Sequence, residues 1–86
     1  LSMELLMEQM QLRESLDDLT KDDSALPKLE ALKDNVQVKI SEKQSNFHED
    51  VVKDDLSSAK RAFHELQFLF KLLSEIEESE EIRLGY

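Results

Sequence analysis

Residues 2–20 read SMELLMEQMQLRESLDDLT and predict a helix with apolar side chains on two opposite sides. One face holds leucines at helical spacing: Leu5, Leu12, Leu16 and Leu19. A second face, centred about 160° away, is called here the methionine face: Met3, Leu6, Met7 and Met10. A helix in a small domain needs only one apolar face to reach the core. We therefore expect the leucine face to be buried and the methionine face to be exposed.

The methionine face ends in acidic residues. After Met10, the next side chains on that side of the helix are Glu14, Asp17 and Asp18. Methionine suits an adaptable docking surface, because its unbranched thioether repacks easily. An apolar face with an acidic border indicates a site for a protein partner.

The composition predicts a single all-helical domain. The 86 residues include one glycine, Gly85, and one proline, Pro27, so the turns that strands and hairpins require are almost absent. Charged residues (36%) and hydrophobic residues (40%) occur in repeating mixtures along the chain and not in separate blocks. The net charge of -9 argues against nucleic acid and against an anionic membrane surface. It favours a partner with a basic patch.

The chain has no cysteine, no visible signal peptide and no apolar run near the roughly 18 residues of a membrane-spanning helix. We therefore expect a cytoplasmic location. Because the sequence starts at Leu1, we also expect it to be a piece of a longer protein.

Two further helices follow a polar break at residues 21–24. Ser24 is a candidate N-cap, and Pro27 fits the first turn of a helix over about 25–53, which would be about 45 Å long. Asp54 or Asp55 can cap a third helix over about 56–82. We expect an elongated three-helix bundle, in which the first helix, about 2–20, packs against a long antiparallel hairpin of the other two. The alternative is one unbroken helix over residues 25–81.

Apolar stripes predict the core of this hairpin. The stripe of the second helix contains Leu26, Leu29, Leu32, Val36, Ile40, Phe47 and Val51. That of the third helix contains Leu56, Ala59, Ala62, Phe63, Leu66, Leu69, Phe70 and Leu73. We expect Phe47, Phe63 and Phe70 to anchor the middle of the core. The acidic run over residues 75–81 opposes the dipole at the end of its helix, so we expect that end to fray.

Phe68 lies off the centre of the third stripe, beside Leu72, and has two interpretations. It can pack against the first helix, or it can extend the methionine face across the boundary between the helices. The spacing alone does not separate them.

No pattern indicates catalysis, a metal site or a cofactor. His48 and His64 have no neighbour at ligand spacing, and Phe68 stands where a zinc-protease motif starting at His64 needs its second histidine. The arginines are too few and too dispersed for an anion-binding catalytic site: Arg13, Arg61 and Arg83. We expect a protein that is not an enzyme.

Residues 6–17, LMEQMQLRESLD, resemble the signature L-M-E-x-[LM]-x-L-R-E-x-[LI]-[DE], which opens the C-terminal domain of the HscB family. HscB proteins are J-type co-chaperones of iron–sulfur cluster assembly. Residues 59–73, with LQFL at 66–69, are similar to the last helix of that domain. The resemblance spans essentially the whole chain, and the first block is its specific part.

The resemblance implies a three-helix bundle that binds the scaffold protein IscU and delivers it to the chaperone HscA. It also implies the scaffold-contacting residues: Leu6, Met7, Met10, Gln11, Glu14, Asp18 and Phe68. Gln11 departs from the acidic residue that is usual there. HscA is stimulated by the His-Pro-Asp motif of the family's N-terminal J domain, and these 86 residues contain no such tripeptide. The chain should therefore bind the scaffold without stimulating the chaperone.

Two other classes compete with a scaffold-binding domain. A self-associating helical protein would use the same methionine face as a dimer seam. A small all-helical enzyme, such as a chorismate mutase, would need inward-facing Arg and Lys residues, which the core stripes lack. We place the scaffold-binding domain first, and expect it to be monomeric.

Overall fold

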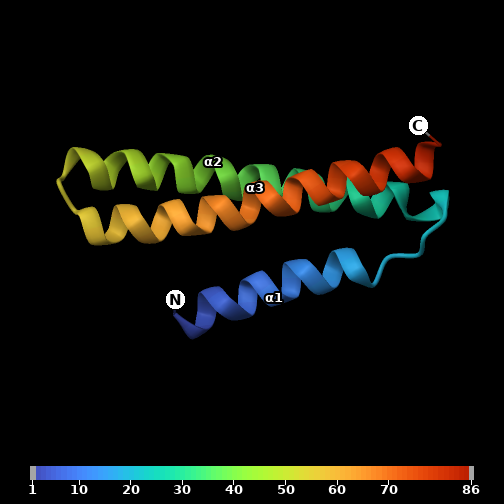
Figure 1. Ribbon diagram of the computed structural model, residues 1–86, viewed down its shortest axis with the longest axis horizontal. Helices are drawn as coiled ribbons and strands as arrows, with labels where there is room; N and C mark the ends of the chain where they lie inside the picture. Colours follow the sequence, from blue (N-terminus) through green and yellow to red (C-terminus); the bar gives the residue numbers. More distant parts are fainter. Residues whose placement is uncertain (1, 86) are drawn as a thin grey trace.

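The computed structural model describes residues 2–85 and contains three α-helices in an elongated bundle of 46 × 25 × 15 Å. The chain forms α1 (Met3–Asp17), a short 3-10 turn η1 (Asp23–Ala25), α2 (Leu26–Val52) and α3 (Leu56–Leu84). Figure 1 shows α2 and α3 side by side as an antiparallel hairpin, with α1 along one side of it and parallel to α3. The predicted fold class is confirmed, and the single unbroken helix over residues 25–81 is wrong.

Short polar side chains fix the ends of α1. The Ser2 hydroxyl accepts a hydrogen bond from the Leu5 N–H at 3.2 Å and so caps the first turn. At the other end the backbone N–H of Asp18 donates to the Glu14 carbonyl at 2.9 Å. The helix is therefore a few residues shorter than the predicted span of about 2–20.

The prediction that Ser24 caps the second helix is wrong. Asp22 is the capping residue of this break: its carboxylate accepts a hydrogen bond from the Ser24 N–H at 3.1 Å and begins η1. Residue Ala25 then leads into α2 without a side-chain cap. Pro27 lies in the first turn of α2, where its missing N–H costs little.

The junction between α2 and α3 is made by two aspartates with different roles. Asp54 turns the chain with φ of +60°, a left-handed conformation that Asp tolerates better than most residues. Asp55 caps α3, since its carboxylate accepts a hydrogen bond from the Ser58 N–H at 3.2 Å. A tight hairpin forms here without glycine or proline.

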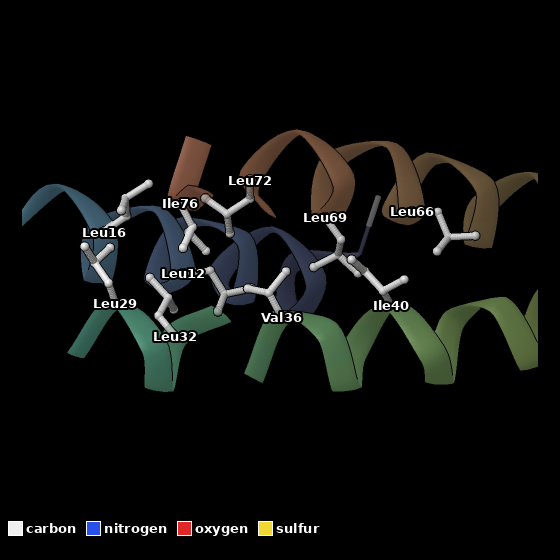
Figure 2. Close-up of a cluster of buried hydrophobic side chains, with 10 residues drawn as sticks. All are labelled: Leu12, Leu16, Leu29, Leu32, Val36, Ile40, Leu66, Leu69, Leu72 and Ile76. Atoms are coloured by element: carbon white, nitrogen blue, oxygen red, sulfur yellow. The ribbon is translucent and has the colours of Figure 1, made fainter. Parts of the chain in front are cut away.

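The core is aliphatic (Figure 2). All three helices contribute to its buried cluster: Leu12, Leu16, Leu29, Leu32, Val36, Ile40, Leu66, Leu69, Leu72 and Ile76. The predicted aromatic anchors are wrong, because Phe63 and Phe70 are each 48% exposed and Phe47 is only half-buried at the edge. Instead, α3 buries the side that carries Leu72 and Ile76, against which α1 packs.

The acidic end of α3 is held by three contacts that the sequence did not reveal. Glu80 pairs with Lys33 of α2 at 3.1 Å, and Glu75 pairs with Arg13 of α1. Arg83 donates to the carbonyl oxygens of Ser79, at 3.1 Å, and of Thr20. The helix therefore continues to Leu84, past the region where we expected fraying. None of the helices formed by residues 2–85 is long and apolar enough to cross a membrane.

Candidate protein-binding face

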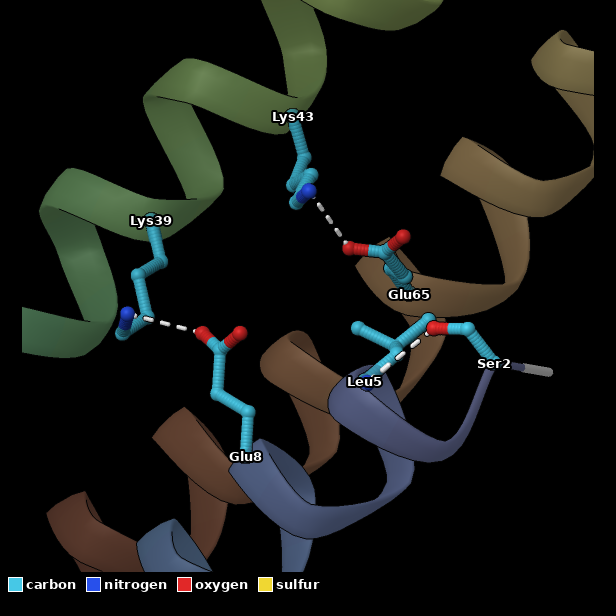
Figure 3. Close-up of polar contacts among 6 residues, drawn as sticks. All are labelled: Ser2, Leu5, Glu8, Lys39, Lys43 and Glu65. Carbon is cyan, nitrogen blue, oxygen red and sulfur yellow. Dashed lines mark hydrogen bonds and ion pairs between the residues drawn. The ribbon is translucent and has the colours of Figure 1, made fainter.

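The rotation of α1 about its axis is fixed by contacts on three sides. Leu12 and Leu16 point into the core between α2 and α3. Glu8 pairs with Lys39 of α2 at 2.7 Å (Figure 3), and Arg13 pairs with Glu75 of α3. Because these ion pairs flank the leucine face and reach different helices, they hold that face inward. The opposite side of α1 is left to solvent.

The methionine face lies on that solvent side, and its predicted exposure is confirmed. Its four side chains are between 42% (Leu6) and 71% (Met3) exposed. A contiguous group of large apolar side chains on the surface of a small protein commonly marks an interaction site. Here the group occupies about two turns of one helix whose other side is anchored.

The border of this face is acidic. Glu14, Asp17 and Asp18 are all exposed, as is Gln11. The only basic residue of α1 is Arg13, which is turned toward α3 and paired with Glu75. No cation of α1 therefore neutralises these carboxylates, so the face presents apolar groups and negative charge together.

Phe68 lies at the edge between α1 and α3 rather than in the open. It is half-buried, packs against the core and shares a small crevice with Leu5, Gln9 and Leu12. The parallel helices are in register through the pair Arg13–Glu75. Leu6 and Phe68 each lie seven residues, about two helical turns, before the residues of this pair, so the same register places Phe68 level with Leu6. This arrangement favours packing against α1 as the main role of Phe68, while its docking role stays a prediction.

A polar groove of about 700 Å³ opens between the N-terminal half of α1 and the end of the hairpin. It exists because α1, with 15 residues, extends about 22 Å, whereas the 27 residues of α2 extend about 40 Å. Lys43 and Glu65 face each other across the hairpin wall of the groove at 2.8 Å (Figure 3). Sequence reasoning did not predict the groove, since it depends on where α1 docks. Within residues 2–85 no three His, Cys, Asp or Glu side chains gather as metal ligands would.

A small helical bundle that exposes an apolar, acid-bordered face on one anchored helix has the features of a protein-interaction domain. The comparison with protein families agrees with this class. The family model described as the HSCB C-terminal oligomerisation domain matches residues 1–77, so the chain belongs to this family. The resemblance inferred from residues 6–17 is thereby confirmed. Comparison with curated proteins and with solved structures gave no match.

Membership identifies the chain as a domain of the HscB type, from a co-chaperone family of iron–sulfur cluster assembly. Proteins of this family are in general not enzymes.

Proposed function

We propose that this domain binds the iron–sulfur scaffold protein IscU through the methionine face and its acidic border, and holds it for the chaperone HscA. The observation that carries the proposal is the exposure of Leu6, Met7 and Met10 on a helix whose rotation is fixed by the core. Delivery to the chaperone would depend on a J domain, whose His-Pro-Asp motif does not occur in these 86 residues.

Binding energy in such an interface concentrates in a few central apolar side chains. Leu6 and Met10 follow each other by one helical turn on the apolar part of the face, whereas Glu14, Asp17 and Asp18 form its rim. Truncation of the best central residue should cost on the order of 2 kcal/mol in binding. The rim carboxylates should act mainly on the association rate.

Self-association through the methionine face is less well supported. Each copy would bring the same carboxylates to the seam, and the single basic residue of α1, Arg13, already pairs with Glu75. No opposite charge on α1 is available to complement Glu14, Asp17 or Asp18 of a second copy. A basic partner surface fits this face better.

The test is the double variant Leu6→Ser with Met10→Ser. We expect scaffold binding to be abolished and the melting temperature to stay close to that of the parent, because both side chains lie on the surface, 42% and 54% exposed. Binding is measured by isotope-edited NMR titration with IscU, and stability by thermal unfolding followed by circular dichroism. In the parent, shifts should be confined to the proposed contact residues.

A matched control is Val38→Ser, which removes an exposed apolar side chain from α2, away from the methionine face. It should leave scaffold binding intact. Unchanged affinity in the double variant would exclude the methionine face as the site. A large fall in its melting temperature would instead place Leu6 and Met10 in the core.

A further inference from the structure

The hairpin carries a second exposed apolar surface, which the proposed function does not use. We call it the aromatic face, and its residues are Phe47, Val51, Leu56, Phe63 and Phe70. Phe63 and Phe70 lie about 150° around α3 from Phe68, which contacts α1. The aromatic face is therefore on the side of the hairpin that α1 leaves uncovered.

This face is apolar enough to need an explanation. Leu56, Phe63, Phe70 and Val51 are between 47% and 67% exposed. The rings of Phe47 and Phe63 lie 6.4 Å apart in a tilted arrangement and form its centre. Aromatic side chains dominate the energetics of protein interfaces because each buries a large area at a low entropy cost.

Along α3, the charge beside the aromatic face differs from that of the rest of the molecule. Residues 56–74 contain a single carboxylate, Glu65, and it is paired with Lys43 at 2.8 Å. The same stretch carries Lys60, Arg61 and Lys71. On a chain with a net charge of -9, this stretch of α3 is a surface that a second acidic copy can approach with little repulsion.

The spacing of the face is self-complementary. Leu56, Phe63 and Phe70 follow each other at seven-residue intervals, so they form a nearly straight row along α3. The row is symmetric about Phe63. In an antiparallel pair around a two-fold axis at Phe63, each Leu56 opposes a Phe70, and the two Phe63 rings meet with both Phe47 rings beside them. The same arrangement places Lys71 of each copy level with Asp55 of the other.

We propose that the aromatic face binds a second copy of this chain in an antiparallel, two-fold symmetric dimer. The matched family model is described as an oligomerisation domain, and its match over residues 1–77 includes the whole row. A dimer of this kind leaves both methionine faces in solvent, so each copy keeps its scaffold site. It differs from our expectation of a monomer from sequence alone.

The first test is the mass of the chain in solution, measured by analytical ultracentrifugation across micromolar to millimolar concentrations. We expect the mass to rise with concentration from 10.0 kDa toward twice that value. Phe63→Ser and, separately, Leu56→Ser should keep the chain monomeric, while Met7→Ser should dimerise like the parent. Circular dichroism confirms that each variant is folded. A parent that stays monomeric, or a dimer lost in Met7→Ser and retained in Phe63→Ser, would overturn the proposal.

The second test fixes the orientation and uses the absence of cysteine from the chain. Leu56→Cys and Phe70→Cys are prepared as separate proteins, mixed and oxidised. An antiparallel pair should give the mixed disulfide-linked dimer in excess over either homodimer. Preferential crosslinking of each variant with itself would exclude the antiparallel arrangement. Because neither test contains the scaffold protein, their outcome is independent of that of the scaffold-binding experiment.

Discussion

The carboxylate of Asp55 illustrates how a single side chain sets the course of this fold. It accepts the Ser58 N–H at the start of α3 and so satisfies one of the donors that a helix leaves open at its N-terminus. This backbone hydrogen bond, with the Ser58 hydroxyl, lowers the pKa of Asp55 from its ordinary value of 3.8. The positive end of the helix dipole favours the same charged form.

The lowered pKa of Asp55 predicts a pH-dependent contribution to stability. A carboxyl whose pKa is lower in the folded state binds its proton more tightly when unfolded, so it stabilises the fold above the unfolded pKa, which is the ordinary value of 3.8. This contribution is lost as the pH falls through the folded pKa. Asp55→Asn keeps an acceptor oxygen and removes the charge. It should be less stable than the parent at pH 7. The difference should begin to shrink as the pH falls toward about 4 and disappear once the pH is below the folded pKa of Asp55.

The measurement for Asp55→Asn is urea unfolding at a series of pH values, with the parent beside it. The quantity compared is the difference in the free energy of unfolding between parent and variant at each pH, because other carboxyls affect both proteins alike. One of these is Asp22, whose pKa is lowered by hydrogen bonds from Ser24 and Thr20. A difference that stayed constant down to acidic pH would show that the charge of Asp55 does not stabilise α3.

At the scale of the element, α1 differs from the other two helices in how it is attached. It buries only Leu12 and Leu16, whereas α2 buries four residues and α3 six. The ion pairs Glu8–Lys39 and Arg13–Glu75 orient α1, but partly exposed pairs of this kind contribute at most about 1 kcal/mol each. The helix that carries the methionine face is thus the one most easily detached.

This attachment predicts that α1 opens before the hairpin. In native-state hydrogen exchange followed by NMR, amides of α1 should exchange faster than those around Val36 and Leu72, which lie at the fully buried centre of α2 and α3. Saturation with the scaffold should slow exchange in α1 more than in the hairpin. Equal protection of all three helices would show that α1 unfolds only together with the core.

The comparison of α1 with α3 shows what the sequence could predict and what it could not. The methionine face of α1 was predictable because a helix at the edge of a bundle has one covered side, and the other side is then open. For α3 the side-chain periodicity predicts a helix, but its apolar residues occupy an arc that is wider than one neighbouring helix can cover. Only the docking of α1 decides that Leu72 and Ile76 are buried while Phe63 and Phe70 stay exposed. Side-chain periodicity contains no information on that choice.

The prediction of helix-capping residues was limited in a similar way. The sequence contains short polar residues at each break. It predicts Asp54 or Asp55 as the cap of α3, and Asp55 is the cap; at the first break it predicts Ser24, whereas Asp22 is the capping residue. Both residues can cap, and the geometry of the preceding loop decides between them. The long-range partners of Arg13 and Arg83 lay equally beyond prediction, because they connect residues that are far apart in the chain.

For the whole molecule, the two exposed apolar surfaces differ in charge and so suit different partners. The methionine face is bordered by carboxylates, whereas the α3 part of the aromatic face has mainly neutral and basic side chains beside it. They lie on opposite sides of the hairpin, so occupation of one does not block the other. A domain built this way can pair with a copy of itself and bind a basic partner at the same time.

The acidic border predicts how scaffold binding depends on salt. Exposed charges act over about one Debye length, about 8 Å at physiological ionic strength, so they speed the encounter with a basic surface more than they hold the complex together. Asp17→Asn with Asp18→Asn should therefore lower the association rate at low salt and flatten its dependence on salt, with little change in the dissociation rate. Leu6→Ser should do the opposite and mainly raise the dissociation rate. Stopped-flow association and dissociation measurements over a salt series separate the two effects.

Glu30→Gln with Asp34→Asn removes the same net charge from α2 and is the control, because both side chains are exposed and lie outside the border. An equal slowing of association in this control would attribute the effect to the net charge of the molecule and not to the face that α1 presents.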